Sequence, residues 1–324
     1  MTHGKDLEQL RDELVDACAW GEEARARALV SKLGTQPRKA RALLEAMLKA
    51  PDAQVRQAAA FGLGELGGAA SVRLLEQQLA LEEAQGDHDG ESVAEAITTA
   101  LGNIEEAGAR TTLVRRLERQ ARGRPQPGEV SSLANALWRR RHPDLLPLVQ
   151  QSLERLDPRV SSSLHGLRAL LERTPEELCT WARDLSVPLE HKTSVMTVLE
   201  ADLPGALLST LPAFISEANT LVETAVGQQG EASYYCERLL SFLLSRREQI
   251  LPVLPEESRS ELRAVVRRLV ASVAPNCSSR ATLLLQFIGQ REDAALIEAH
   301  RPAEPLLAKV FDEAAQALRR LQKS

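Results

Sequence analysis

Apolar positions between Pro51 and Leu79 recur every three or four residues, which predicts two amphipathic helices. Asp52 is expected to cap the first helix, because its carboxylate can accept hydrogen bonds from the free backbone N–H groups of the first turn. The glycine pair Gly67–Gly68 ends that helix, since glycine readily adopts the left-handed conformation of a helix end. The second helix is expected to begin near Ala69. The predicted buried positions are Val55, Ala58, Ala59, Gly62, Leu63, Leu66, Val72, Leu75 and Leu79.

The same pattern returns 38 positions later, so the segment 91–119 is predicted to be a second copy of the helix pair. Most of the apolar face of the first helix is small, and Ala58, Ala59, Ala60 and Gly62 would let a neighbouring helix approach closely. An internal repeat of this length is typical of a solenoid, in which stacked copies bury a common core. The matched pairs are Val55 with Val93, Ala58 with Ala96, Ala59 with Ile97, Leu63 with Leu101, Gly64 with Gly102, Leu66 with Ile104, Leu75 with Leu113 and Leu79 with Leu117.

The first copy resembles a HEAT repeat of the short bacterial kind named after phycobilisome-lyase subunits. The residues that carry this resemblance follow the pattern D-x-x-V-R-x-x-A-x-x-x-L-G-x-L and are Asp52, Val55, Arg56, Ala59, Leu63, Gly64 and Leu66. The resemblance covers residues 51–119 well, although Ala94 stands where the second copy should carry the arginine. It implies an all-α fold, a right-handed α-solenoid of stacked antiparallel helix pairs. Proteins of this family bind proteins, nucleic acids or cofactors, so the resemblance implies architecture more than activity.

The remaining helical patterns suggest one continuous array over residues 1–324. Pro/Gly-rich breaks such as 123–128 read as loops between repeats, because helical patterns resume directly after them. The predicted divisions are N-terminal cap helices at 1–50, the clearest repeats at 51–186, divergent helical pairs at 187–275, and a C-terminal repeat and cap at 276–324.

Composition favours a soluble helical protein of the cytoplasm. The 324 residues are 44% hydrophobic and only 3% aromatic, which suits a core of leucine, alanine and valine. The four cysteines are isolated, so neither a disulfide framework nor a metal-ligand spacing is indicated. The chain shows no apolar run long enough to span a membrane and no signal-peptide pattern at its start. No cofactor is expected.

Charge is strongly segregated along the middle of the repeat region. Residues 74–109 contain nine acidic residues and no lysine or arginine, whereas residues 110–141 contain nine arginines and two glutamates. Arginine suits planar recognition of carboxylate or phosphate groups. The predicted partner-binding residues, placed on the inner-helix surface, are Arg115, Arg116, Arg119, Arg139, Arg140 and Arg141. Three interpretations remain open: a solvated rim paired with the acidic repeat, a docking site for an acidic protein surface, and a nucleic-acid site.

Several other groups suit simple packing or surface roles better than chemistry. Residues 85–91 look briefly like a calcium loop, but Ala96 stands where a bidentate glutamate is needed, so an exposed acidic loop is expected. Glu83 beside it is expected to be a dispensable surface position. Trp138, next to an arginine cluster, would suit a DNA-repair glycosylase, yet it lies on an apolar stripe and is predicted to be core. Core or turn roles are also expected for Cys179, Glu190 with His191, and at least one residue of 234–236.

These observations predict a non-catalytic scaffold or adaptor that binds another protein, most readily one with an acidic surface. The first alternative follows from the family resemblance: a subunit similar to bilin lyases that cradles a tetrapyrrole together with a partner. The second alternative is a nucleic-acid binder that uses the arginine-rich segment 110–141, which should show steep salt dependence.

Overall fold

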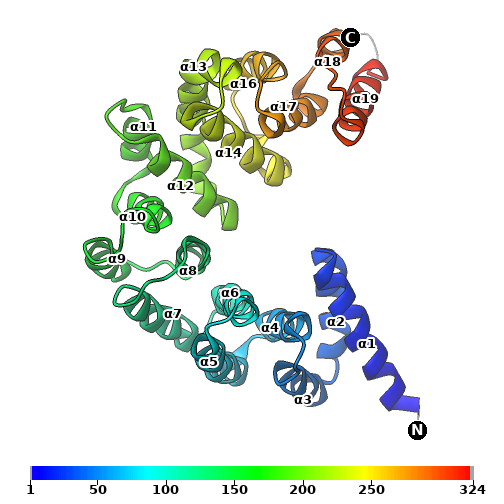
Figure 1. The fold of residues 1–324 in the computed structure, drawn as a ribbon, viewed down its shortest axis with the longest axis vertical. Coiled ribbons are helices and arrows are strands. Elements are labelled where there is room, and N and C mark those ends of the chain that lie inside the picture. Colours follow the sequence, from blue (N-terminus) through cyan, green and yellow to red (C-terminus); the bar gives the residue numbers. More distant parts are fainter. Residues whose placement is uncertain (1, 322–324) are drawn as a thin grey trace. The chain divides into compact units, whose positions relative to one another are not determined.

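The computed structural model describes residues 2–321, and within them the chain is helical throughout and contains no strand. The chain divides into two compact units, formed by the segments Met1–Leu164 and His165–Ser324. The predicted all-α fold class is confirmed. In each unit neighbouring helices pack in pairs, as the helices of an α-solenoid do (Figure 1). The right-handed sense and the continuity of the array over both units stay predictions.

Unit 1 is built from nine helices in its described part, joined mostly by short turns. They are α1 (Thr2–Ala19), α2 (Glu23–Gly34), α3 (Pro37–Leu48), α4 (Ala53–Leu66), α5 (Gly68–Gln85), α6 (His88–Asn103), α7 (Ala107–Gln120), α8 (Pro127–Arg139) and α9 (Leu145–Leu153).

The next helix, α10 (Ser162–Glu172), contains the boundary between the segments, and the helices of unit 2 follow it. They are α11 (Pro175–Arg183), α12 (Leu189–Ala201), the 3-10 helix η1 (Gly205–Thr210), α13 (Leu211–Gly227), α14 (Glu231–Ser245), α15 (Arg247–Ile250), α16 (Glu256–Leu269), α17 (Pro275–Ile288), α18 (Asp293–Ala299) and α19 (Pro305–Arg319).

Each unit contains two parallel rows of helices. In unit 1, α4 packs on α6 and α6 on α8, while α5, α7 and α9 form the second row behind them. In unit 2, α12, α14, α17 and α19 form one row, and α11, α13 and α16 form the other. The core therefore lies between the rows and between successive copies, which is why each helix buries an apolar stripe and keeps one side open.

The two sequence copies correspond to the helix pairs α4–α5 and α6–α7, here named the first copy and the second copy. Asp52 caps α4 as predicted, because its carboxylate accepts a 2.7 Å hydrogen bond from the backbone N–H of Gln54. Gly67 ends α4 with a positive φ of 60°. Leu63 and Leu101, which are equivalent by the 38-residue shift, are both fully buried.

Small residues set the spacing between the stacked copies. A Cβ atom added to Gly64 would lie 2.9 Å from the Cβ of Ala100, and one added to Gly102 would lie 2.9 Å from the Cα of Ala136. Those distances are shorter than real side-chain contacts, so α4, α6 and α8 approach one another through positions where only hydrogen fits. The predicted close approach of small residues is confirmed.

The segment 85–91 differs from its predicted exposed loop. Helix α6 begins at His88, and the Asp87 carboxylate accepts a 2.7 Å hydrogen bond from the backbone N–H of Gly90. Asp89 and Glu91 lie in the first turn of α6, where negative charge favours the helix dipole. The acidic cluster therefore starts a helix, and only Gly86 and Asp87 connect α5 to α6.

Candidate functional site

Two of the predicted partner-binding arginines join neighbouring copies on the α5–α7 row. Arg115 lies 2.9 Å from Glu76, and Arg119 lies 2.9 Å from Glu83. Both arginine side chains are about half exposed, at 60% and 49%. Exposed pairs of this kind contribute roughly 0–1 kcal/mol each. Arg115 and Arg119 therefore match the interpretation of a rim paired with the acidic repeat, and their binding role stays a prediction.

Arg116 is a buried structural residue. Its guanidinium Nε lies 3.1 Å from Glu83, its Nη2 lies 3.4 Å from Glu129, and its Nη1 donates to the Ala94 carbonyl at 2.9 Å. Burial lowers the pKa of Arg116, and the two glutamates oppose that shift. Because Arg116 is fully buried, a partner cannot reach it without displacing α5 or α8. Glu83, expected to be dispensable, contacts both Arg116 and Arg119.

The other three predicted arginines lie at the end of α8. Arg139 donates to the Asn103 side chain, and Arg140 donates to the Ile104 carbonyl at 3.0 Å, so both contact the C-terminus of α6. Positive charge at a helix C-terminus is favourable. Arg141 donates to the Trp138 carbonyl at 3.1 Å and stacks over the Trp138 ring at 4.6 Å.

The six arginines do not form one surface. Helices α7 and α8 pack on each other and are joined by the short segment 121–126, so they run in opposite directions. Arg119 lies beside that connection, whereas Arg139 lies at the far end of α8, about 20 Å away along the helix axis. The predicted inner-helix surface thus separates into a group on α7 and a group at the end of α8.

A regular grid of side chains, all polar except Phe61, lies on the open side of the α4–α6–α8 row. Its positions repeat every four residues within each helix, and the first two sets are related by the 38-residue shift. We call this grid the open face, and every one of its residues is at least partly exposed. Its members are Gln57, Phe61 and Glu65 on α4, Glu95, Thr99 and Asn103 on α6, and Ser131, Asn135 and Arg139 on α8.

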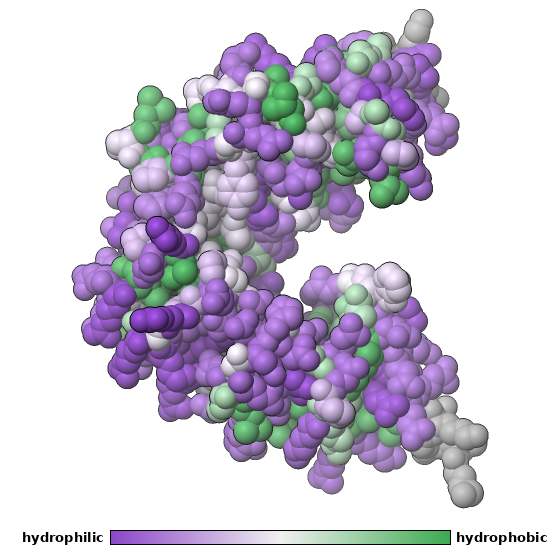
Figure 2. All heavy atoms as spheres, in the orientation of Figure 1, coloured by the Kyte–Doolittle hydropathy of each residue, from purple (hydrophilic) through white to green (hydrophobic). Residues whose placement is uncertain are grey.

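The open face offers hydrogen-bonding groups. Five of its nine side chains carry an uncharged amide or hydroxyl group, three are charged and Phe61 is apolar. The Oδ1 atom of Asn135 is buried with no hydrogen-bond partner in the part of the chain that the structure describes. Figure 2 shows that the visible surface of unit 1 around α4–α7 is mainly hydrophilic. Of this set, only Arg139 is among the partner-binding residues that the sequence predicts. The other members are indicated in the sequence by mostly polar positions that recur every four residues within a helix and return after the same 38-residue shift as the apolar positions.

The remaining candidates are packing residues. Trp138 is 3% exposed, as predicted for a core residue. Of the segment 234–236, Tyr235 and Cys236 are buried, and the Tyr235 hydroxyl donates to the Phe214 carbonyl at 3.0 Å. Tyr234 is 55% exposed, which matches the expected split between core and surface. Burial raises the pKa of the Cys236 thiol, which disfavours a reactive thiolate.

His191 has a partner that the sequence did not indicate. Its ring stacks on that of His165 in unit 2, with the ring centroids 4.0 Å apart. Burial lowers the pKa of both rings, and for His165 the value falls to about 4. Both imidazoles are therefore neutral at pH 7, and two neutral rings can stack without repulsion. Cys179 is half-buried, and its Sγ lies 3.8 Å from the Ser209 carbonyl.

The described residues show neither a metal site nor a membrane span. Within residues 2–321, no group of three His, Cys, Asp or Glu side chains is arranged to bind a metal ion. None of the helices described above combines the length and the apolar character needed to cross a bilayer. In comparisons with known proteins, no family model matches this chain and no curated protein matches its sequence.

Proposed function

We propose that this chain is a HEAT-like helical-repeat protein that acts without catalysis as a scaffold or adaptor and binds another protein. The observation that carries the proposal is the open face, a preformed grid of nine side chains on three stacked helices of unit 1. Because Gly64 and Gly102 fix the spacing of these helices, the grid loses little entropy when a partner docks.

Charge differs between the helices of the open face, since Arg139 lies at the C-terminal end of α8 and Glu65 at that of α4. Arg139 and, beside it, Arg141 lie at the C-terminal end of α8, and an acidic part of the partner would fit there. Glu91 and Glu129 lie in the first turns of α6 and α8, and Glu95 of the open face lies in the middle of α6, close enough for their charges to affect it. A protein partner that presents complementary charges to the arginines of α8 and to these glutamates would be bound in one orientation, since electrostatic complementarity fixes register more than affinity.

Affinity capture from native lysate tests this proposal. The bait is the full chain, compared with a variant that carries Gln57→Lys and Thr99→Lys on the open face. A matched control carries Gln77→Lys and Ala80→Lys on α5, at exposed positions of the other row. We expect the wild type to capture a protein partner, and this capture should persist after nuclease treatment. The control variant should capture the partner equally well, and the open-face variant should capture at least tenfold less.

Other outcomes would decide against the proposal. Capture that disappears with nuclease would assign the chain to nucleic-acid binding, and equal capture by both variants would exclude the open face. A visible absorption band in the purified protein would favour the tetrapyrrole-binding alternative. The Arg139, Arg140 and Arg141 triple exchange is a poor probe here, because Arg139 and Arg140 contact the end of α6 and their loss would disturb packing.

A further inference from the structure

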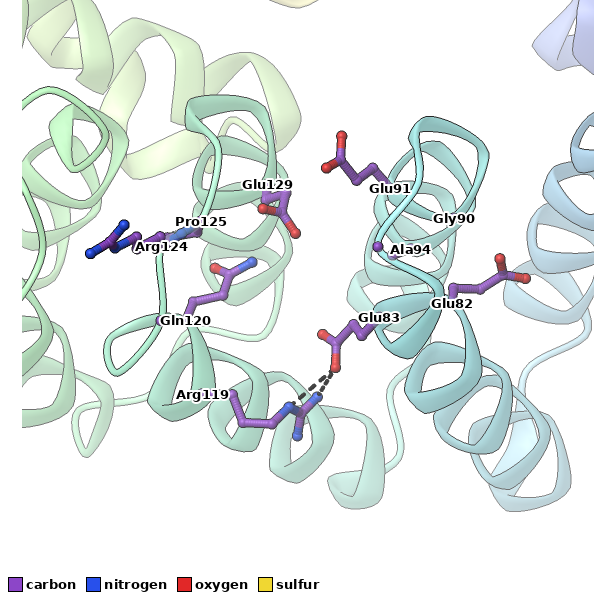
Figure 3. Close-up of a pocket in the computed structure, with 12 residues that line it drawn as sticks. Glu82, Glu83, Gly90, Glu91, Ala94, Arg119, Gln120, Arg124, Pro125 and Glu129 are labelled. Atoms are coloured by element: carbon purple, nitrogen blue, oxygen red, sulfur yellow. Dashed lines mark hydrogen bonds and ion pairs between the residues drawn. The ribbon is translucent and has the colours of Figure 1, made fainter.

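A pocket of about 310 Å³ lies in unit 1 where α5, α6, α7 and α8 meet (Figure 3). We call it the α6–α8 pocket. Four glutamates and two arginines are among its lining residues, together with Ala94 and Gln120. In Figure 3 the Gln120 side chain extends from α7 into the space between α6 and α8, and Glu91 and Glu129 approach the same space from those two helices.

The first copy shows what occupies the equivalent position there. Arg56 of α4 donates to the Glu82 carboxylate of α5 through Nε at 2.8 Å and Nη2 at 3.2 Å. Gln78 donates to the same carboxylate at 2.7 Å. The Glu82 side chain is fully buried and that of Arg56 is 8% exposed, so a guanidinium fills this layer of the first copy and is paired there.

The 38-residue shift places different residues in the second copy. Arg56 corresponds to Ala94, and Glu82 corresponds to Gln120. The guanidinium that fills the first copy is therefore replaced by a methyl group, and the carboxylate that pairs with it is replaced by an amide. Gln120 has nearly the same shape as the glutamate that it replaces, but no arginine stands at the position of Arg56.

Gln120 is left with unpaired polar atoms. Its residue is only 8% exposed, and both its Nε2 and Oε1 atoms are buried without a hydrogen-bond partner among residues 2–321. A buried amide that makes no hydrogen bond is unfavourable, because it has lost its hydrogen bonds to water and has gained none in the protein. Such a group at the wall of a pocket is suited to a ligand that supplies the missing hydrogen bond.

Arg116 does not take the missing partner's place. The 38-residue shift pairs it with Gln78, on the row behind. Its guanidinium contacts the Ala94 carbonyl, Glu83 and Glu129, and makes no hydrogen bond to Gln120. Arg116 therefore stabilises the wall of the pocket and leaves the Gln120 amide open to a further group.

The pocket retains a net negative charge, because four glutamates line it against two arginines, and Glu95 lies nearby in addition to the buried Arg116. Burial raises the pKa of the Glu95 carboxyl, and the negative charges of Glu129 and Glu91 raise it further, against the opposing effect of Arg116. Glu95 also connects the pocket to the open face, since it belongs to that face and lies close to the backbone of Gly128 at the start of α8. A positive group entering here would relieve the repulsion among the glutamates.

We propose that the α6–α8 pocket receives an arginine side chain of the bound protein, which takes the position that Arg56 occupies in the first copy. The Gln120 Oε1 accepts one N–H of the incoming guanidinium, and Glu91 and Glu129 supply carboxylates for the others. A planar group with five donors fits this set better than an ammonium ion does. The proposal rests on the proposed function, because it names a feature of the same protein partner.

Short peptides test the pocket without the natural partner. The probes are acetyl-Ala-Arg-Ala-amide and its citrulline analogue, which has nearly the same shape and no charge. Binding to the purified full chain is measured by titration calorimetry and by chemical-shift changes of the Gln120 side-chain amide. We expect the arginine peptide to bind at least about tenfold more tightly than the citrulline peptide, a difference of roughly 1.4 kcal/mol.

Two variants of the pocket sharpen the test. Ala94→Arg places a guanidinium where the first copy has one, and Ala94→Arg combined with Gln120→Glu transfers the whole pair of the first copy. Either variant should reduce arginine-peptide binding by tenfold or more. Ala80→Arg adds the same side chain at an exposed position of α5 and should leave binding unchanged. Thermal melts establish whether each variant is folded. If Ala94→Arg alone does not fold, the double variant, in which the new glutamate can pair with the new arginine, is used for the binding measurement instead.

Equal binding of the arginine and citrulline peptides would overturn the proposal, as would undiminished binding by the folded double variant. These results are separable from failure of the proposed function. A chain that captures a protein through its open face, yet does not distinguish the two peptides, retains the scaffold role without an arginine-binding pocket.

Discussion

The first and second copies share their apolar core and differ in their buried polar layer. In the first copy one arginine and one glutamate pair inside the stack, with Gln78 as a third member. In the second copy the arginine position is Ala94, and the buried guanidinium of Arg116 on the other row makes a separate arrangement that does not include Gln120. Its carboxylates come from Glu83 of the preceding copy and Glu129 of the following one.

This difference shows that a repeat can keep its packing while its charges move. The apolar positions are tied to the geometry of stacking, because each must face the neighbouring helix. A buried charge needs only compensation nearby, and several helices can supply it. In the second copy the compensating groups lie on other helices, and a small pocket and an unpaired amide are present at Gln120.

The largest expected effect comes from removing one member of each buried arrangement. Arg56→Met leaves the Glu82 carboxylate, whose side chain is fully buried, without its cation. Loss of one partner of a buried pair costs about 3–5 kcal/mol in the free energy of unfolding. Arg116→Met leaves Glu83 and Glu129, whose side chains are 25% and 19% exposed and can still reach water, so its cost should be about 1–2 kcal/mol.

Scanning calorimetry of the full chain measures both changes. Arg115→Met is the control, because that exposed arginine pairs with Glu76 at the surface and its loss should cost under about 1 kcal/mol. The double exchange of Arg56 and Glu82 to methionine should recover most of the stability lost with Arg56 alone. If Arg116→Met proved more costly than Arg56→Met, the contrast between the two copies would be wrong.

A smaller effect is expected where the copies are alike. Gly64→Ala and Gly102→Ala each place a methyl group within 3 Å of the facing helix, so α4 and α6 or α6 and α8 must move apart. Overpacking of this kind typically costs about 1–3 kcal/mol, partly offset by alanine's better helix propensity of about 1 kcal/mol. Denaturant melts should therefore show similar losses for the two variants.

Gly108→Ala is the matched control for this pair. It also lies in a helix of the second copy, yet an added Cβ would only touch Val72 at 3.4 Å. Its stability should equal or slightly exceed that of the wild type. A loss for Gly102→Ala no greater than for this control would mean that the glycine contacts do not set the spacing of the copies.

The sequence predicted the stacked helices because burial imposes a period that can be counted. Leu63, Leu101 and the glycines Gly64 and Gly102 occupy the positions that the 38-residue shift gave them. The start of α6 was missed, since the cluster 85–91 has the composition of a loop and only the Asp87 cap turns it into a helix start.

The candidate site was less accessible to sequence reasoning. The arginine-rich segment 110–141 suggests one patch because its residues are near in sequence. In the structure, α7 and α8 are antiparallel, so Arg119 and Arg139 lie far apart. Arg116 and Arg119 differ by three residues, and one is buried while the other is half exposed. The pocket could have been suspected from the paired changes at positions 94 and 120, since both depart from the first copy in the polar layer.

The smallest expected difference concerns the caps of α4 and α6. Asp52 and Asp87 each accept a 2.7 Å hydrogen bond from the first turn of their helix, and replacing such a cap by alanine typically costs about 1 kcal/mol. Helix α6 also has Asp89 and Glu91 in its first turn, whereas α4 has no acidic residue there.

Asp52→Ala should therefore lower the free energy of unfolding more than Asp87→Ala does. In the Asp87→Ala variant, Asp89 and Glu91 still interact favourably with the positive end of the α6 dipole, and Asp87 no longer repels them. Charge–dipole terms are worth about 0.3–1 kcal/mol at low salt. Denaturant melts in low salt should show a gap of roughly that size, and the gap should narrow in 1 M salt, where the screening length falls to about 3 Å. A gap that is unchanged by salt would trace the difference between the copies to the cap hydrogen bonds themselves.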